Sequence, residues 1–216
     1  MQRNGNIVIF DLGRVMIRIA DNWREACEFA GIDYREYNYI PEAQQSFNDA
    51  EDALERGNIS FDEMAERFML SSNGVYTIKE IKNIYLSIIN IEFTGMVDFV
   101  KYLQNNDYYT ACLSNTCDAH WEQFLYSGRY PAIEMLDTHL ASHLLGVRKP
   151  EETIYRKAME MLKADGKSII FFDDKAENIA GAMRCGWNSM QIMPGKSSIE
   201  QMQRYIKQFE KNTQNP

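Results

Sequence analysis

The segment IVIFDLG, residues 7–13, joins a four-residue apolar run to a carboxylate and a glycine. Short runs that are apolar at every position are typical of strands buried on both faces, as in a parallel sheet. Three later short segments are largely apolar, and we expect strands at Tyr109–Leu113, Ile169–Phe172 and Ser189–Ile192. Helical patterns lie between the later strands, which indicates βαβ crossovers. The predicted fold class is therefore α/β, with a Rossmann-like three-layer α/β/α core around a parallel sheet.

Each of the first three predicted strands is followed by a residue with an oxygen-bearing side chain. Asp11 follows the first strand, Ser114 the second, and the pair Asp173 and Asp174 the third. An open parallel sheet binds its ligands at the carboxyl ends of its strands. The fold itself therefore predicts that these side chains meet at one edge of the sheet.

The segment from residue 18 to residue 93 interrupts this alternation and looks helical throughout. Apolar residues recur at helical spacing from Trp23, and Gly31 is expected to end that helix. The pattern S-x-x-E from Ser60 predicts a helix N-terminus, and a further helix is expected over Ile78–Ile89. We therefore predict two domains. Residues 1–17 and 94–216 form the α/β core, and residues 18–93 form a helical cap over the strand ends; helices packed directly on the sheet are the alternative.

The composition excludes several classes of protein. The chain has 216 residues, a formal net charge of −8 and the apolar and charged fractions of a soluble globular protein. An acidic chain argues against nucleic acid as a partner, because nucleic-acid binders usually present a basic face. No apolar run has membrane-spanning length and the N-terminal MQRNGN has no apolar leader, so no membrane partner is expected and a cytoplasmic location is the default. The four cysteines form no C-x-x-C pair and are expected to be reduced thiols.

Asp11 is the candidate nucleophile. A carboxylate at a strand end can attack phosphorus with one oxygen and bind Mg²⁺ with the other, and enzyme carboxylates do form acyl-phosphates. Gly13 has no Cβ, so its carbonyl could approach the metal closely. Asp173 and Asp174 repel each other unless a cation compensates, and Mg²⁺ prefers oxygen ligands, with Asn178 placed to steady a metal-bound water. The alternative is that these are ordinary turn and cap residues.

Ser114, Asn115 and Lys149 are the candidate phosphate-binding residues. A hydroxyl and backbone N–H groups after a strand can donate to phosphate oxygens, and an ammonium would offset the repulsion between a carboxylate and the phosphate. Pro150 is expected at the first position of the next helix, where it restricts its neighbour and holds Lys149 away from that helix. Arg148 competes with Lys149 for this role, and a turn followed by a solvated basic pair is the alternative.

Four short motifs in this order resemble those of the haloacid dehalogenase superfamily of hydrolases. They are FDLGRV (residues 10–15), LSNT (113–116), RKP (148–150) and FFDDKAEN (171–178). The resemblance covers the core, and the helical segment falls where this superfamily inserts its C1-type cap. The closest likeness is to the D-L-G phosphatase subgroup, which includes an α-glucose-1-phosphate phosphatase and has a cap stretch similar to RGNISFDEMAE (residues 56–66).

The resemblance also implies a role for each residue of the site. Asp11 would be the nucleophile and a metal ligand, and Asp174 would bind Mg²⁺ directly. Asp173 would act through the outer shell of the metal, and the carbonyl of Gly13 would complete the inner shell. The hydroxyl of the second motif and Lys149 would bind phosphate. Mg²⁺ is the implied cofactor.

One departure from the family pattern concerns Gly13. Most phosphatases of the superfamily carry a second aspartate there, as the general acid for the leaving group and the base for water. General acid–base help is typically worth about 10²–10⁴-fold in rate, so its loss matters least with a good leaving group or a substitute acid from the cap. Arg14 and Arg18 follow, and Arg14 is a candidate either to clamp a substrate oxyanion or to pair with an acidic residue of the cap.

The leading hypothesis is a Mg²⁺-dependent phosphatase that hydrolyses a small phosphomonoester, with a sugar phosphate as one candidate, through an aspartyl-phosphate. A 2-haloacid dehalogenase-type hydrolase would use the same nucleophile without a metal, and a non-catalytic protein would only bind phosphorylated ligands. A receiver-type signalling domain carries such residues in the reverse order and is disfavoured. A monomer and a homodimer are both compatible with the sequence. The cap candidates for contact with the substrate are Trp23, Tyr39, Phe47 and Glu51.

Overall fold

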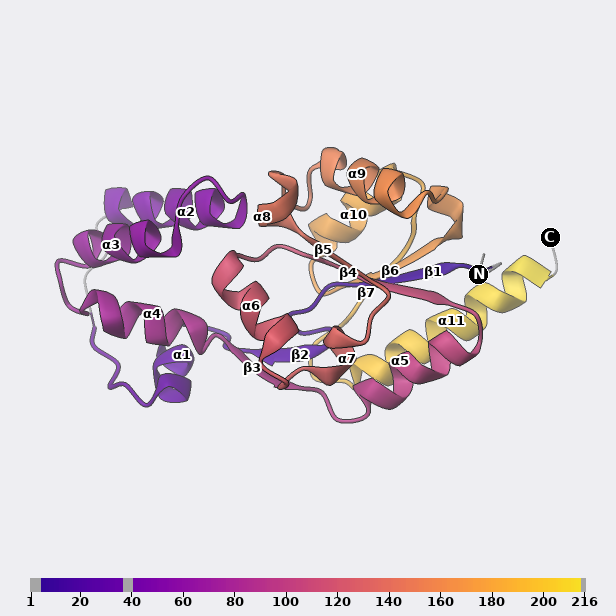
Figure 1. Ribbon diagram of the computed structural model, residues 1–216, viewed down its shortest axis with the longest axis horizontal. Helices are drawn as coiled ribbons and strands as arrows, with labels where there is room; N and C mark the ends of the chain where they lie inside the picture. The colour runs from indigo at the N-terminus through magenta and orange to yellow at the C-terminus, as the bar shows by residue number, and fades with distance from the viewer. Residues whose placement is uncertain (1–4, 37–40, 215–216) are drawn as a thin grey trace.

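The computed structural model describes residues 5–36 and 41–214 of the chain. Its centre is a parallel five-stranded sheet with the order β5-β4-β1-β6-β7 (Figure 1). The strands are β1 (Ile7–Phe10), β4 (Tyr109–Ser114), β5 (Thr138–Ala141), β6 (Ile169–Asp173) and β7 (Asn188–Gln191). This order places β1, which leads into Asp11, at the middle of the sheet between β4 and β6.

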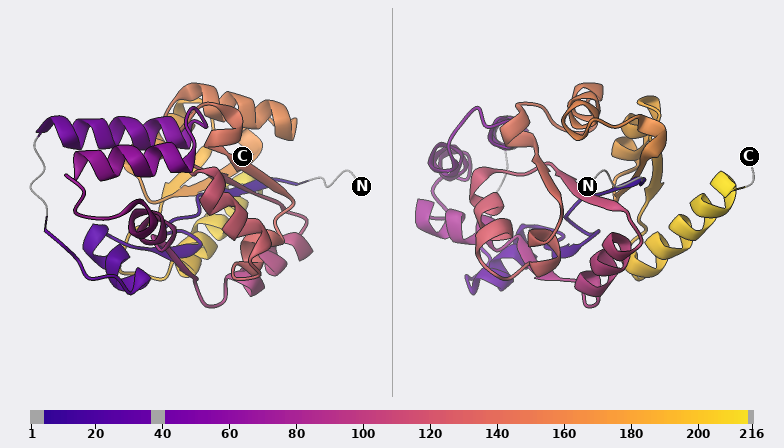
Figure 2. Two further views of the ribbon diagram at one scale, coloured as in Figure 1. Left: turned by 60° about the vertical axis from the view of Figure 1, so that its left-hand side comes forward. Right: turned by 45° about the vertical axis from the view of Figure 1, so that its right-hand side comes forward.

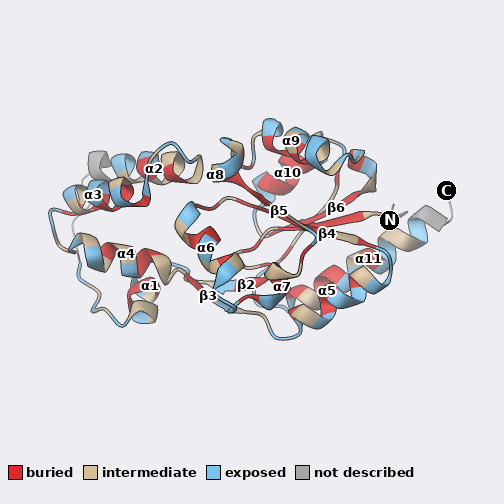
Figure 3. Cartoon of the chain, viewed as in Figure 1, coloured by how far each residue is buried: buried red, intermediate tan, exposed pale blue. Residues whose placement is uncertain are grey.

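Helices cover both faces of the sheet and make three layers, as the sequence predicted. Val8 and Phe10 pack into one apolar layer, whereas Ile7 and Ile9 pack into the other. The first layer includes α5 and α11, and the second includes α9 and α10. These helices span α5 (Met96–Asn105), α9 (Glu152–Leu162), α10 (Ala176–Arg184) and α11 (Ser198–Gln214). Because successive strand residues point to opposite faces, β1 must be apolar at every position. Figure 3 shows the central strands of the sheet as mainly buried.

The four predicted strands are present, with ends within one residue of the expected positions. β5 was not predicted, because it begins with the half-buried polar residues Thr138 and His139. The predicted helix start at Pro150 was wrong. A turn closed by the N–H of Glu151 intervenes, so that α9 begins only at Glu152. The remaining short elements of the core are α6 (Asp118–Tyr126), α7 (Pro131–Glu134), α8 (Ser142–Leu145) and the 3₁₀ turn at Gly166–Ser168.

A helical insert lies between β1 and β3 and resembles a cap. Its helices are α1 (Trp23–Ala30), α2 (Pro41–Glu55), α3 (Phe61–Ser71) and α4 (Ile78–Leu86). Figure 1 shows them grouped at one end of the molecule, on the side to which β1 runs, and the two turned views of Figure 2 keep the indigo and purple helices on that side. The insert has its own apolar cluster, which includes Ala65, Phe68, Tyr76, Ile81 and Ile84. The helices therefore do not simply cover a face of the sheet.

Local signals in the sequence set the ends of these helices. The side chains of Asn22 and Ser60 accept hydrogen bonds from backbone N–H groups in the first turns of α1 and α3. Thr77 and Glu80 form a reciprocal capping box at the start of α4. Gly31 ends α1 at a φ of 65°, a conformation that suits glycine. The predicted stop at Gly31 and start at Ser60 are both present.

Two strands at the ends of the insert were not predicted. β2 (Ile17–Ile19) pairs antiparallel with β3 (Ile89–Glu92), and the two carry the chain out of the core and back. Both alternate apolar and polar residues, but over only three and four residues, which is too short for the alternation to stand out in the sequence. The helix expected over residues 78–89 ends at Leu86, because the chain turns there into β3, which begins at Ile89. The division into domains at residues 18 and 93 stays a prediction.

The cysteines are free thiols in or near the apolar interior. Cys27, Cys112 and Cys117 are buried, and Cys185 is half-buried. Burial raises the pKa of the Cys112 and Cys117 thiols to about 12, so both stay protonated near neutral pH. Within residues 5–36 and 41–214, no helix has both the length and the apolar character needed to cross a membrane.

Candidate active site

The carboxyl ends of the central strands bring three carboxylates together. Asp11 follows β1, Asp173 ends β6, and Asp174 comes directly after it. Each offers an oxygen atom, and these atoms all lie within 4.8 Å of one another. Ser114, the last residue of β4, lines the same cavity as Asp11 and Asp174. Segments from the two ends of the sequence therefore meet because β1, β4 and β6 are neighbours in the sheet.

Lys149 is the cation of this cluster. Its Nζ donates hydrogen bonds of 2.7 Å to Asp11 Oδ1 and of 2.7 Å to Asp173 Oδ2, and its side chain is 1% exposed. Asn115 fixes the backbone of Lys149 from both sides: its Oδ1 accepts from the Lys149 N–H at 2.9 Å, and its Nδ2 donates to the Lys149 carbonyl at 3.0 Å. The ammonium thus enters the site at a position set by the turn after β4.

Asp173 is held on its other side by the start of α10. Asn178 Nδ2 lies 3.0 Å from both carboxylate oxygens, and the backbone N–H of Lys175 donates to Oδ1 at 2.8 Å. Together with Lys149, these donors surround a side chain that is fully buried. The amide of Asn178 is therefore directed at Asp173, and Asp173 is directed at Lys149.

Burial and neighbouring charges together raise the pKa values of Asp11, Asp174 and Lys149. Desolvation raises the pKa of Asp11 to about 6, although Lys149 lowers it. Desolvation also raises the pKa of Asp174, and the charge of Asp173 adds to this shift. Burial alone would lower the pKa of Lys149, but the neighbouring carboxylates hold it above its usual value. Lys149 therefore stays an ammonium at neutral pH.

The donor set fits a divalent cation with a preference for oxygen. Asp11, Asp173 and Asp174 bring three carboxylates to one buried ammonium, so the cluster has an excess of negative charge. Mg²⁺ prefers carboxylate, carbonyl and water oxygens, and Gly13 lines the cavity beside Asp11 and Asp174. Both oxygens of Asp173 accept hydrogen bonds from the protein, whereas Asp11 and Asp174 each do so through one oxygen, so Asp11 and Asp174 are the side chains best placed to hold the ion.

A cavity of about 200 Å³ joins these residues to the insert. On the insert side it is lined by Glu51 and Glu55 of α2 and by Tyr85 of α4. Of the cap candidates named from the sequence, Glu51 thus lies on the cavity wall. Trp23 and Phe47 pack in the apolar interior of the insert, where both rings contact that of Phe68, and Tyr39 lies outside the described residues.

His120 of α6 also lines the cavity and was not predicted. Its Nε2 lies 2.8 Å from the carbonyl oxygen of Tyr85, and its ring stacks on the Tyr85 ring with 4.9 Å between centroids. Burial lowers the pKa of His120 to about 4. Its imidazole is therefore neutral near pH 7 and donates to that carbonyl. A lone histidine in an otherwise ordinary helix gave no signal of this placement.

The side chain of Ile19 occupies the space beside Gly13. A Cβ added at Gly13 would lie 3.1 Å from Ile19 Cδ1, closer than an ordinary van der Waals contact. β2, which carries Ile19, thus packs closely against the turn after the candidate nucleophile. A second carboxylate at position 13 would have to displace this apolar side chain.

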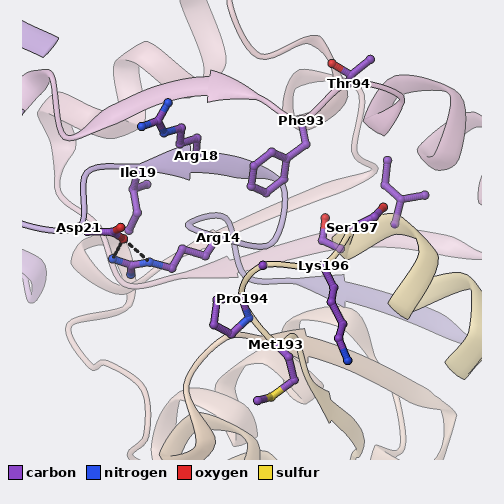
Figure 4. A pocket seen from close by; sticks show the side chains of 13 residues that line it. Arg14, Arg18, Ile19, Asp21, Phe93, Thr94, Met193, Pro194, Lys196 and Ser197 are labelled. Atoms are coloured by element: carbon purple, nitrogen blue, oxygen red, sulfur yellow. Dashed lines mark hydrogen bonds and ion pairs between the residues drawn. The ribbon is translucent and has the colours of Figure 1, made fainter. Parts of the chain in front are cut away.

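Arg14 pairs with acidic residues on two sides. Its guanidinium lies 3.1 Å from Asp21 and 3.5 Å from Asp174, at a backbone φ of 58°. Figure 4 shows the contact with Asp21 beside a second cavity, of about 430 Å³, between β2 and the segment 193–199. Arg14 therefore borders both cavities and pairs with Asp21 of the insert, while Arg18 pairs with Glu25. A clamp on a substrate oxyanion stays a prediction.

Comparison with models of protein families identifies one family that matches most of the chain. A family model described as haloacid dehalogenase-like hydrolase matches residues 6–186. The fold is similar to that of a HAD family enzyme from Bacteroides thetaiotaomicron, with 21% identity, a TM-score of 0.75, and coverage of 89% of this chain and 96% of that chain. A further structure of that enzyme is a complex with magnesium and inorganic phosphate.

Two other solved structures have the same fold. A HAD-like family hydrolase from Porphyromonas gingivalis is 20% identical, with a TM-score of 0.75 and coverage of 94% of this chain and 98% of that chain. An L-2-haloacid dehalogenase is 16% identical, with a TM-score of 0.61 and coverage of 91% of this chain and 90% of that chain. At such identities the likeness speaks for the fold, and the chemistry has to be argued from the site.

Proposed function

The chain belongs to the haloacid dehalogenase-like hydrolases, and we propose that it is a Mg²⁺-dependent phosphatase acting on a small phosphomonoester through an aspartyl-phosphate. The observation that carries this proposal is the cluster of Asp11, Asp173 and Asp174 around the buried ammonium of Lys149. A strand-end carboxylate, a fixed cation and a pair of carboxylates are what phosphoryl transfer to a carboxylate requires.

The residues of the site divide the work of two in-line displacements. An oxygen of Asp11 attacks phosphorus while the bond to the leaving oxygen breaks, and water then attacks the aspartyl-phosphate and releases Asp11. Lys149 orients Asp11 through the bond to Oδ1 and reduces its repulsion of the phosphate. Bound Mg²⁺ would neutralise charge on the phosphoryl oxygens. The residues that would hold it are Asp11, Asp174 and the carbonyl of Gly13.

Phosphate recognition falls to the turn after β4. The hydroxyl of Ser114 lines the cavity and can donate to a phosphate oxygen. The side-chain amide of Asn115 already bonds on both sides to the backbone of Lys149. A contact between Asn115 and phosphate is therefore left to its backbone N–H, and its side chain positions the cation.

The acidic pair favours phosphate ester over carbon–halogen hydrolysis, the alternative represented among the structural relatives. Displacement of a halide by Asp11 needs no metal, and Asp174 beside Asp173 would then add repulsion in a half-buried site without a benefit. The Bacteroides thetaiotaomicron relative was solved with magnesium and phosphate together. The cavity volume of about 200 Å³ favours a small leaving group, such as a sugar or another polyol.

The experiment that tests this function is a panel of phosphomonoesters assayed with Mg²⁺ and with EDTA, for the wild-type protein and for Asp11→Asn. A matched control is Asp62→Asn, the same chemical change at an exposed residue of α3 that pairs only with Lys82 among the described residues. We expect Mg²⁺-dependent turnover that Asp11→Asn abolishes and Asp62→Asn retains.

A parallel panel of short 2-haloacids without metal tests the alternative reaction. Halide release that is independent of Mg²⁺, with no phosphate release, would replace the proposed function by dehalogenation. Binding of phosphate with Mg²⁺ but no turnover of any ester would point to a non-catalytic phospholigand-binding protein. Undiminished hydrolysis by Asp11→Asn would remove Asp11 from the role of nucleophile.

A further inference from the structure

The proposed reaction needs a proton donor that the turn after β1 does not supply. An alcohol leaves as an alkoxide unless an acid protonates its oxygen, and such help is typically worth about 10²–10⁴-fold. Position 13, two residues after the nucleophile, is a glycine, and Ile19 occupies the adjacent space. Lys149 is committed to Asp11 and Asp173, and its pKa is raised. The donor must therefore come from another wall of the cavity.

Among the described residues, the insert and the neighbouring helix α6 bring four ionisable side chains to the cavity, those of Glu51, Glu55, Tyr85 and His120. His120 is neutral, with its Nε2–H directed at the carbonyl of Tyr85. The phenol of Tyr85 has a pKa well above its usual value because of burial, which makes it a poor acid. What remains on this side are the carboxyl groups of Glu51 and Glu55, one helical turn apart on the same face of α2.

Glu55 lines the cavity, and its carboxyl group is held in place by Arg148. The Glu55 side chain is 16% exposed, and Oε2 lies 2.7 Å from Arg148 Nη2. That contact is not aligned as a hydrogen bond, and Oε2 has no hydrogen-bond partner among the described residues. The aligned bond of Arg148 goes instead to Asp52, at 2.8 Å. Arg148 thus fixes the place of the Glu55 carboxyl without satisfying it.

The surroundings of Glu55 favour its protonated form. Desolvation raises the pKa of Glu55 to about 7, and the charge of Glu51 adds to this, whereas Arg148, Lys175 and Lys149 lower it. Burial also raises the pKa of Glu51 itself. Two carboxyl groups in one desolvated cavity then retain a proton between them near neutral pH.

From these observations we infer that Glu55 is the general acid and base of the proposed phosphatase, supplied by the insert in place of the carboxylate that position 13 lacks. This inference rests on the proposed function. In the first step an oxygen of Asp11 bonds to phosphorus, the phosphorus–oxygen bond of the ester breaks, and the leaving oxygen takes the proton of Glu55. In the second step the oxygen of a water molecule bonds to phosphorus while the water gives a proton to the Glu55 carboxylate. The bond from Asp11 to phosphorus breaks. The acid is thereby restored.

The inference also assigns a catalytic role to the contact between insert and core. Glu55 can reach the ester oxygen only while α2 lies against the loop of Arg148. Asp52 and Arg56 of α2 make further ion pairs with Arg148 and Glu151, at 2.8 Å and 2.5 Å. These ion pairs hold the acid over the strand ends. The catalytic site is therefore complete only when the insert is closed on the core.

The test compares two leaving groups in Glu55→Gln and in the control Glu66→Gln, the same change at an exposed position of α3. p-Nitrophenol is acidic and leaves without a proton, whereas glycerol needs one. With Mg²⁺, Glu55→Gln should lower kcat/KM for glycerol phosphate about 10²–10³-fold and for p-nitrophenyl phosphate less than about 10-fold. Glu66→Gln should change neither.

A second variant makes the test independent of lost stability. Removal of the Glu51 charge should lower the pKa of Glu55, so in Glu51→Gln the fall of kcat for glycerol phosphate at high pH should begin at lower pH. The inference would be overturned if the high-pH fall of kcat in Glu51→Gln stayed at the wild-type pH, or if Glu55→Gln lost equal amounts of kcat/KM with both esters. Either result would show that Glu55 only supports the structure. Full glycerol phosphate activity in Glu55→Gln would also overturn the inference. If the wild-type protein hydrolyses neither ester, the proposed function itself fails.

Discussion

Replacing Lys149 by methionine would remove a buried cation and keep most of the side-chain volume. In the folded protein Lys149 is 1% exposed and bonds at 2.7 Å to both Asp11 and Asp173, of which Asp173 is fully buried. Loss of one partner from a buried ion pair typically costs about 3–5 kcal/mol, because the remaining charge has lost its compensation. For a chain of this size that corresponds to a fall in Tm of roughly 6–20 °C.

The assay is urea unfolding in EDTA, followed by tryptophan fluorescence, for Lys149→Met and for the control Lys101→Met at an exposed position of α5. The control should stay within about 0.5 kcal/mol of wild type. Adding Asp173→Asn to Lys149→Met removes one of the stranded charges. The double variant should therefore be more stable than the sum of the two single losses predicts, by about 0.5–3 kcal/mol.

Mg²⁺ supplies a further arm of the same experiment. Without an ammonium that competes for Asp11 and Asp173, the carboxylates of Lys149→Met should bind the ion more tightly than those of the wild-type protein. A ligand at 100 times its Kd stabilises a folded state by about 2.7 kcal/mol, so Mg²⁺ should restore more stability to the variant than to wild type. A loss below about 1 kcal/mol in EDTA, or an additive double variant, would refute the description of Lys149 as the buried counter-charge of this cluster.

Two further predictions concern stability. The pKa of His120 is about 4 in the folded protein and 6.5 when unshifted, so the neutral ring stabilises the fold above about pH 6.5, and this contribution is lost as the pH falls towards 4. Between pH 7 and pH 4, the free energy of unfolding of His120→Gln, measured in urea, should therefore fall by about 3 kcal/mol less than that of wild type. Equal losses would contradict this. In α10 a Cβ at Gly181 would lie 2.8 Å from the Pro150 carbonyl and 2.8 Å from Tyr155, so Gly181→Ala should destabilise by about 1–2 kcal/mol, because overpacking outweighs the gain of about 1 kcal/mol in helix propensity. A rise in the urea midpoint of Gly181→Ala would contradict that reasoning.

The core was predictable because one pattern encodes both the strands and the site. A strand buried on two faces has to be apolar at every position, which makes β1 and β6 visible in the sequence. The first polar residue after such a strand is then at the carboxyl edge of the sheet, which locates Asp11, Ser114 and Asp173 without any knowledge of their partners. β5 was missed because its first two residues, Thr138 and His139, are polar and only half-buried.

Side chains that position others were harder to predict. Backbone N–H groups around Asn115 were expected to bind phosphate, which stays a prediction, but the sequence did not indicate that the side-chain amide bonds to the backbone of Lys149 on both sides. A contact of Asn178 with a metal-bound water stays a prediction, and the sequence did not indicate that its Nδ2 lies 3.0 Å from both oxygens of Asp173. An asparagine near a strand end is compatible with each of these contacts. Only the path of the neighbouring chain decides which partner its amide meets.

The insert shows why the substrate side of the cavity is not readable from sequence. In α2 the residues Glu51, Asp52, Glu55 and Arg56 look like a solvated charged face with helical spacing. In the fold Glu51 and Glu55 line the cavity, whereas Asp52 and Arg56 pair with the core loop around Arg148. A rotation of α2 by one residue, about 100°, would exchange these roles without changing any local preference of the sequence. The end of a buried strand locates a site residue in the sequence, but a helix offers no such landmark. The identity of the group that faces the leaving oxygen therefore depends on how the insert docks on the core. Substitutions that loosen this docking should change the preference for leaving groups before they change the affinity for phosphate.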